Sequence, residues 1–260
     1  MTEEQSAPLI LVSTEGPVTI VALNRPAKRN ALNVELLGQL VAAVEAAERD
    51  TTQRILILRG EGPAFCAGLD LDEAASPDSA QRSAELIAKI LLALSTSRLV
   101  TIAAVHGAAI AGGAGLMTAC DLVVAAIGTK IGYPETRRGL VAALVMTFLR
   151  RQLRERDARE LLLTGELIDA SRALEIGLVN RVVPASDLMS EARRYADSVL
   201  CGGPEAVANT KRLLAELWPR LVQADLDRAL SFHLEARESP EAAEGIAAFK
   251  EKRPPNWTPG

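Results

Sequence analysis

The chain has 260 residues, of which 48% are hydrophobic, 24% are charged and only 3% are aromatic, and its formal net charge is −4. This balance indicates a globular protein of one large domain, or one domain with an appendage, whose core is built from aliphatic side chains. The negative charge and the scarcity of aromatic residues argue against a nucleic acid as the main partner.

The sequence offers no sign of a membrane span, a secretion signal or a metal site. Its most apolar stretch, residues 99–119, is interrupted by His106 and by glycines, and its first ten residues are acidic. The three cysteines (Cys66, Cys120 and Cys201) are widely spaced and form no CxxC pair. We therefore expect reduced thiols, no bound metal and a cytoplasmic location.

The first part of the chain alternates strands and helices. Residues 8–23 read as a hairpin that turns at Gly16, and Asn33 can cap a helix whose apolar residues recur at helical spacing. Short apolar runs predict buried strands at 55–58, 99–105 and 122–127, with a helix at 80–95 between the first two. This order predicts an α/β core with parallel pairing.

The second part, from about residue 141, reads as almost wholly helical. One strand is expected at 179–183, and helices are expected at 186–200, 204–219, 222–237 and 240–251. We place the division between the core and a C-terminal helical region between residues 195 and 196.

The stretch AAIAGGAGLM (108–117) follows a predicted buried strand and permits several interpretations. A phosphate-binding P-loop would need a lysine where Gly113 stands, and a dinucleotide fingerprint would need a glycine where Thr118 stands. The free N–H groups at a helix start could instead form an oxyanion hole, which glycines would open to a ligand. Close packing of a helix on a strand remains the alternative.

A second glycine turn, EGPAFCAGLDL (61–71), also follows a predicted strand. Together with LNRPAKRNAL (23–32) and YPETRRGL (133–140), the two turns resemble the crotonase superfamily of enoyl-CoA hydratases and isomerases. The similarity continues through residues 161–183 and the closing FKEKRPPNW (249–257), so it covers nearly the whole chain.

The resemblance implies a fold and an assembly. The fold is the crotonase (ClpP-like) spiral of ββα repeats, an α/β architecture, with the acyl-CoA site in residues 1–195. Residues 196–260 would form a helical trimerisation region, so the expected state is a homotrimer or a homohexamer. The expected substrate is a coenzyme A thioester, and no permanently bound cofactor is implied.

The resemblance also assigns roles to individual residues. The backbone N–H groups of Leu69 and Gly112 would form the oxyanion hole. The segment with Lys28, Arg29 and Ala31, together with the Ala67 backbone, would bind coenzyme A. Phe249 and Lys252 match a pattern that reaches the coenzyme A of a neighbouring subunit. Alternatively, the basic residues are surface side chains that are exposed to solvent and bind nothing.

The carboxylates depart from the pattern of the family's hydratases, which use two glutamates. Glu135 matches one of them, but Gly115 occupies the position of the other. A single carboxylate fits a proton shuttle that isomerises the double bond of an enoyl-CoA. Hydration, decarboxylation or dehydration of an acyl-CoA, and acyl-CoA binding without catalysis remain alternatives.

Other polar residues receive structural interpretations. We expect Asp70 to hydrogen-bond the backbone of its own turn and Cys66 to be a packing residue. His106 and His233 have no partner at ligand spacing, so neither is assigned to a metal or a catalytic triad. The arginines between residues 137 and 159 indicate helix faces that are exposed to solvent or lie between subunits. The alternative is that they bind an acidic partner.

Overall fold

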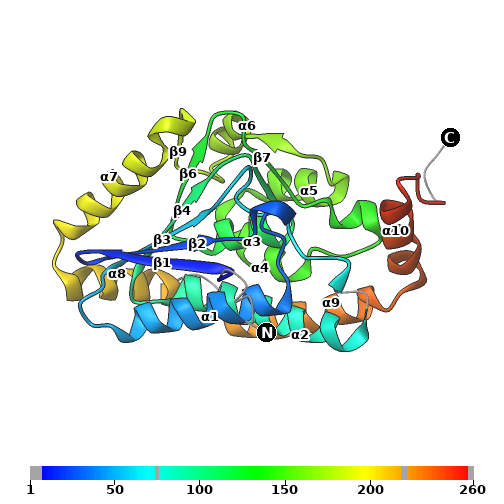
Figure 1. Cartoon of the computed structure of the whole chain (residues 1–260), viewed down its shortest axis with the longest axis horizontal. Coiled ribbons are helices and arrows are strands. Elements are labelled where there is room, and N and C mark those ends of the chain that lie inside the picture. Colours follow the sequence, from blue (N-terminus) through cyan, green and yellow to red (C-terminus); the bar gives the residue numbers. More distant parts are fainter. Residues whose placement is uncertain (1–7, 74–75, 218–221, 257–260) are drawn as a thin grey trace, which may run out of the picture.

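A six-stranded sheet forms the centre of the computed structural model, which describes residues 8–73, 76–217 and 222–256. The strands lie in the order β1-β2-β3-β4-β6-β9, as Figure 1 shows. β1 and β2 are antiparallel, and every later pair of neighbours is parallel. The expected hairpin and the expected parallel core are confirmed. The strands are β1 (Ile10–Glu15), β2 (Val18–Leu23), β3 (Ile55–Gly60), β4 (Val100–Val105), β6 (Leu122–Ala126) and β9 (Arg181–Val183).

Both faces of this sheet are covered by helices, as the continuous apolar runs of its strands require. Leu56 and Leu58 of β3 belong to a hydrophobic cluster that includes residues of the two long helices α1 (Val34–Arg49) and α2 (Pro77–Thr96). Ile55 and Ile57 belong to a second cluster, with α7 (Leu188–Leu200). Because side chains alternate along a strand, each cluster lies on one face of the sheet.

The first long helix begins at the cap expected from the sequence, and the second begins at Pro77, three residues before the expected start at residue 80. The Asn33 side chain accepts a hydrogen bond from the Leu36 N–H at 3.0 Å at the start of α1. The Ser76 hydroxyl accepts one from the Ser79 N–H at 3.3 Å at the start of α2. Such caps satisfy N–H groups that have no partner inside the helix. α2 thereby carries Ile87 to the edge of the cavity described below.

A second, three-stranded sheet was not expected from the sequence. It consists of β5 (Ala108–Ile110), β7 (Lys130–Gly132) and β8 (Ile168–Asp169). Strands of two or three residues are too short to show an alternating pattern. They matter nonetheless, because β5 leads into helix α3 (Gly112–Ala119) and β7 leads into the 3-10 helix η3 (Pro134–Arg138).

The C-terminal part is helical, as expected. The predicted helices 222–237 and 240–251 agree with the structure, and the prediction 204–219 agrees through residue 217, since residues 218 and 219 lie outside the described part. The proposed division after residue 195 falls within α7 and stays a prediction. The remaining helices are α4 (Ala143–Gln152), α5 (Glu155–Thr164), α6 (Ala170–Glu175), α8 (Pro204–Leu217), α9 (Val222–Arg237) and α10 (Pro240–Glu251).

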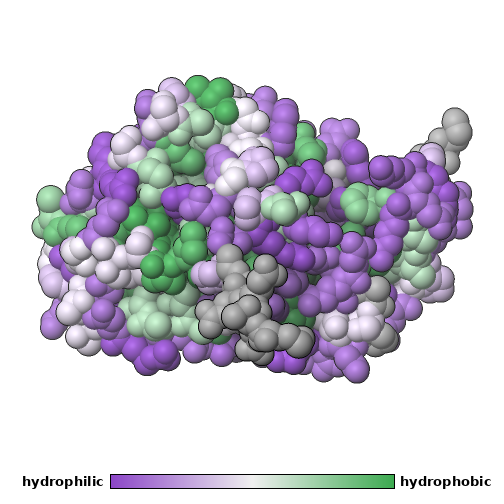
Figure 2. Space-filling model, in the orientation of Figure 1, coloured by the Kyte–Doolittle hydropathy of each residue, from purple (hydrophilic) through white to green (hydrophobic). Residues whose placement is uncertain are grey.

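Hydrophilic residues cover most of the face drawn in Figure 2, with hydrophobic patches between them, one of them in the area where Figure 1 draws β1 and α8. Across residues 8–73, 76–217 and 222–256, no helix is long and apolar enough to cross a membrane. Cys66, Cys120 and Cys201 are free thiols, and the first two are buried.

Candidate active site

The glycine turn at residues 61–71 directs the Leu69 N–H away from the neighbouring segment. The Leu32 N–H donates to the Gly68 carbonyl at 2.8 Å, and the Asp70 N–H donates to the Leu32 carbonyl at 2.9 Å. In such a parallel bridge the residue between these two contacts points its own N–H the other way. Gly68 has φ +94°, and a Cβ there would lie 2.9 Å from the Ile110 carbonyl oxygen, so only glycine fits this turn.

The glycine turn at residues 108–117 begins α3 with a strained residue. Ala111 has φ 51° and ψ −120°, and its N–H donates to the Gly132 carbonyl at 2.8 Å. Gly112 follows as the first residue of α3, so its N–H has no acceptor inside the helix. A non-glycine residue at positive φ is unfavourable and persists only where the surrounding structure fixes it. Here the small sheet fixes it, through Gly132 of β7.

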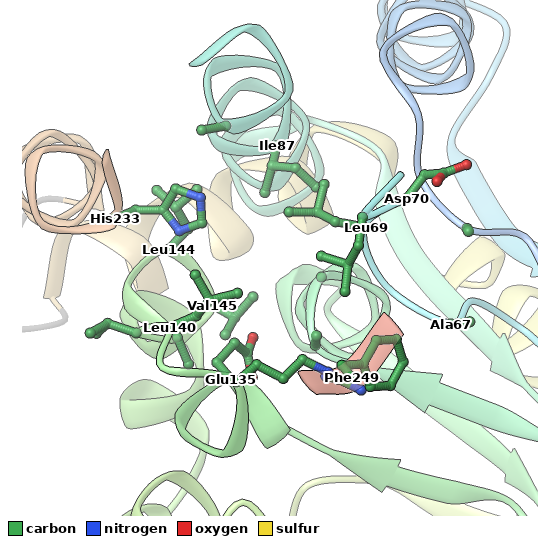
Figure 3. A pocket seen from close by; sticks show the side chains of 18 of the residues that line it. Ala67, Leu69, Asp70, Ile87, Glu135, Leu140, Leu144, Val145, His233 and Phe249 are labelled. Carbon is green, nitrogen blue, oxygen red and sulfur yellow. The ribbon is translucent and has the colours of Figure 1, made fainter. Parts of the chain in front are cut away.

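Both turns open into one cavity of about 250 Å³. Leu69 and Gly112 line it together with Glu135, so the three residues expected to act on the substrate are brought together. Lys28, Arg29, Ala31, Ala67 and Phe249 of the expected coenzyme A site also line it. Figure 3 shows Leu69 and Glu135 on different walls, with Val145 and Leu140 near the glutamate.

Glu135 lies in η3 and is poised between its charged and neutral forms. Its Oε2 atom is buried and has no hydrogen-bond partner among the described residues. Burial raises the pKa of this carboxyl to about 7, and a backbone hydrogen bond and the nearby Arg138 cation oppose the rise only in part. A carboxyl with such a pKa can accept and return a proton at neutral pH.

Gly115 lies one turn into α3, and the space beside it is filled. A Cβ at this position would lie 2.4 Å from Cγ1 of Val145 and 3.2 Å from its Cβ. Val145 belongs to α4, which packs against α3. The chain therefore lacks a second glutamate here and also lacks the room for one.

The rim of the cavity is held by polar contacts within the segment 25–31 and between it and the glycine turn at residues 61–71. The Arg25 guanidinium donates to the Asp70 carboxylate at 2.6 Å and to the Ala31 carbonyl at 3.1 Å. Asp70 also accepts from the Asp72 N–H at 3.1 Å, which confirms its expected structural role. Buried Asn30 donates to the Ala64 carbonyl at 2.8 Å and accepts from the Arg25 N–H at 2.8 Å. These contacts fix the backbone that carries Lys28 and Arg29.

Helix α10 covers one side of the cavity. The Arg138 guanidinium lies 4.4 Å from the centroid of the Phe249 ring, and Lys250 is 3.5 Å from the Asp72 carboxylate. We assigned Lys252 to coenzyme A binding from the sequence, but Lys252 does not line the cavity. Lys250 lines it instead. Lys252 ends α10 with a φ of 55°. The assignment of Lys252 therefore finds no support within this single chain.

Besides Lys250, two polar residues of the cavity were missed as site candidates. Arg138 and His233 both line it, and each has a buried nitrogen (Nε of Arg138 and Nε2 of His233) without a hydrogen-bond partner in the described residues. A signal for His233 exists, since it lies on the helical face marked by Leu226 and Ala229, which are buried. The site of Cys66 is as expected, because its thiol is buried and donates to the Asn30 carbonyl at 3.1 Å.

The chain is similar to known proteins over nearly its whole length. A family model described as enoyl-CoA hydratase/isomerase matches residues 13–260. The chain is 36% identical over 265 residues to an enoyl-CoA hydratase of Mycobacterium tuberculosis, with 99% of each chain covered. It is 35% identical over 251 residues to the 2,3-dehydroadipyl-CoA hydratase of Escherichia coli, with 95% of this chain and 98% of that protein covered.

A solved structure gives the same result. The crystal structure of carnitinyl-CoA hydratase from Mycobacterium avium superposes with a TM-score of 0.87 at 34% identity, covering 97% of this chain and 99% of the other. The similarity thus extends over both glycine turns, η3 and the C-terminal helices. The protein has the α/β crotonase fold that its sequence indicates, and it belongs to the enoyl-CoA hydratase/isomerase family of acyl-CoA enzymes.

Proposed function

We propose that the protein isomerises the double bond of an enoyl-CoA thioester with a single proton-carrying carboxylate. The observation that carries this proposal is the closed space beside Gly115, which Val145 fills. Of the carboxylates among the described lining residues, Asp70 is held by Arg25 and Asp72 lies next to Lys250. Glu135 is the one with a buried oxygen that has no partner.

The proposed reaction moves one proton along the acyl chain. Ionised Glu135 removes a proton from carbon 2 of a 3-enoyl thioester, and the electron pair of that bond moves toward the thioester oxygen to give a dienolate. Protonated Glu135 then gives the same proton to carbon 4, and the double bond forms between carbons 2 and 3. No other acid or base is consumed, which suits a site with one free carboxyl.

The negative charge of the dienolate would be held by the backbone. In the proposal the thioester oxygen accepts hydrogen bonds from the N–H groups of Leu69 and Gly112, and the start of α3 adds positive potential. One such donor typically contributes about 3 kcal/mol to the stability of the transition state. Because the donors belong to the backbone, the Leu69 side chain is free to line the acyl pocket.

Coenzyme A would enter over the basic rim. Lys28 and Arg29 supply cations for its phosphates, and Ala31 and Ala67 are small enough to let the nucleotide approach their backbone. We assign Phe249 and Lys250 to the same region of this chain, and we retain Lys252 as a candidate for the coenzyme A of a neighbouring subunit in a trimer or hexamer.

Hydration of a 2-enoyl thioester is the second candidate, because relatives that match nearly the whole chain are named hydratases. In that reaction Glu135 alone would have to activate a water molecule and also supply a proton to carbon 2. The proposed isomerisation requires no positioned water, which is the reason for preferring it.

Product analysis distinguishes the two reactions. Wild-type protein is incubated with trans-2-, cis-3- and trans-3-enoyl-CoA thioesters, and the products are separated by chromatography and weighed by mass spectrometry. We expect a product of unchanged mass from the 3-enoyl substrates, and we expect Glu135→Gln to lower its rate by about 100-fold or more. Glu166→Gln, at an exposed carboxylate outside the cavity, serves as the control and should retain the wild-type rate.

Two results would overturn the proposal. A product heavier by one water, without isomer, would establish the hydratase instead. Unchanged isomerisation by Glu135→Gln would remove Glu135 from the mechanism.

A further inference from the structure

His233 lies in the same cavity as Glu135 but has no part in the proposed proton transfer. It belongs to α9, which packs against α2 and α4. Figure 3 shows its ring beside Leu144, on the opposite side of the cavity from Ala67. Since Ala67 lies on the side of the basic rim, His233 faces the part of the cavity that the far end of an acyl chain would reach.

The wall between the glutamate and the histidine is apolar. Its lining side chains are aliphatic, and Figure 3 shows them between and around the two polar groups: Ile87, Leu140, Leu144 and Val145. An alkyl chain would be buried favourably along such a wall. One polar atom at its far end is then the feature that can distinguish one acyl chain from another.

The His233 ring lines this space, and one of its nitrogens lacks a hydrogen-bond partner among the described residues. The Val141 carbonyl accepts a hydrogen bond from the ring, whereas Nε2 is buried and has no partner among the described residues. Burial and, to a smaller extent, the neighbouring Arg237 cation lower the pKa of His233 to about 4. The ring is therefore neutral at pH 7, and with one nitrogen donating to Val141 the other keeps its lone pair.

We propose that His233 is a specificity-determining residue that accepts a hydrogen bond from a hydroxyl group at the distal end of the acyl chain. Hydroxylated enoyl-CoA thioesters are then better substrates than alkyl thioesters of equal length. A buried acceptor without a partner is unfavourable, and an alkyl chain leaves it so, whereas a hydroxyl group satisfies it. This inference rests on the proposed function, because it places the thioester between the rim and Glu135.

The test compares pairs of enoyl-CoA thioesters of increasing length, each with and without a terminal hydroxyl group. For wild-type protein we expect the ratio of kcat/KM for the hydroxylated over the alkyl substrate to reach about tenfold at one chain length, the effect of one buried hydrogen bond. His233→Phe, which removes the acceptor, should bring this ratio to one or below. His233→Gln, which retains an acceptor, should keep part of it.

Glu235→Gln is the matched control, since this exposed residue belongs to the same helix, and it should show the wild-type ratio. A wild-type ratio near one at every length, or a ratio that survives in His233→Phe, would overturn the assignment of His233. If His233→Phe does not fold, the wild-type series and His233→Gln decide the question.

Binding measurements separate this inference from the proposed reaction. Calorimetric titration with saturated acyl-CoA thioesters, with and without the terminal hydroxyl group, requires no turnover. If wild-type protein binds the hydroxylated ligand more tightly but isomerises nothing, the reaction is wrong and the role of His233 holds. If it isomerises alkyl substrates but shows no preference in either assay, the role of His233 is wrong and the reaction holds.

Discussion

Glu135 is subject to two opposing influences on its charge. Burial disfavours the carboxylate, whereas the Arg138 cation favours it, and the pKa settles at about 7. Arg138 in turn has a lowered pKa, because its own burial outweighs the attraction to Glu135. The Phe249 ring at 4.4 Å compensates the guanidinium for part of its lost hydration. A proton carrier and the group that adjusts it therefore lie three residues apart in η3.

The reaction should depend on pH through Glu135. Because the ionised form removes the proton, and because the pKa is about 7, kcat/KM is expected to rise from pH 6 to pH 8 with an apparent pKa near 7. The measurement is the rate of 3-enoyl-CoA isomerisation across this range. Loss of the Arg138 cation removes the influence that favours the carboxylate, so Arg138→Leu should move the profile to higher pH.

Arg137→Leu is the control for Arg138→Leu, because Arg137 is exposed and bonds instead to the Thr164 carbonyl at 2.9 Å. Its profile should overlay that of the wild type. A profile for Arg138→Leu that shows lower kcat/KM at an unchanged apparent pKa would mean that Arg138 only supports the fold.

Among the helices of the site, glycines allow one element to pack closely against another. A Cβ at Gly245 of α10 would lie 2.3 Å from the Arg138 carbonyl oxygen, and one at Gly139 would lie 2.4 Å from the Glu241 carbonyl oxygen. Helix α10 thus rests directly on the backbone of η3. Gly115 plays the same part between α3 and α4, where Val145 occupies its side-chain space.

Gly115→Ala tests this packing. Alanine gains about 1 kcal/mol over glycine in a helix, but the contact with Val145 adds an overpacking cost of about 1–3 kcal/mol. We expect Gly115→Ala to lower the free energy of unfolding in the wild-type background and to raise it when Val145→Ala is also present. Urea denaturation of the four proteins of this cycle measures both changes.

Gly38→Ala is the matched control, since Gly38 lies in α1 and a Cβ there would meet nothing within 4 Å. It should stabilise the protein by about 0.5–1 kcal/mol, as glycine replacements in open helix positions do. If Gly115→Ala behaved like Gly38→Ala in the wild-type background, Val145 would not close that space.

The elements differ in how well the sequence predicts them. Strands β3 and β4 and the helices α9 and α10 follow from apolar periodicity, which reports burial directly. β7 and β8 do not, because strands of three and two residues are too short to show an apolar pattern. For the site, the limit is tertiary packing. Gly112 and Glu135 stand in local motifs, whereas Arg138 and His233 acquire their places only when α9 and α10 pack against the core.

The whole molecule exposes apolar side chains on its C-terminal helices. Leu213 and Leu214 of α8 are 52% and 54% exposed, and Phe232 of α9 is 43% exposed. Exposed apolar groups on helices are typical of surfaces that associate. They support the homotrimer or homohexamer expected from the resemblance, in which such helices meet.

Light scattering during size-exclusion chromatography tests this assembly. We expect the mass of three or six chains for the wild type and a shift toward one chain for Leu214→Glu, which would place a charge in an apolar interface. Glu216→Gln, on the same helix, should assemble normally. A wild-type protein that elutes with the mass of one chain at every concentration would exclude the assembly.

The positions of the lining residues along the chain determine when the cavity can be completed during synthesis. Both glycine turns and η3 belong to the first 138 residues, whereas His233 comes from α9 and Phe249 from α10. A nascent chain that has folded only through α7 holds the strands and both N–H donors but lacks one side of the pocket. The enzyme should therefore remain inactive on the ribosome until α10 has emerged and settled on η3.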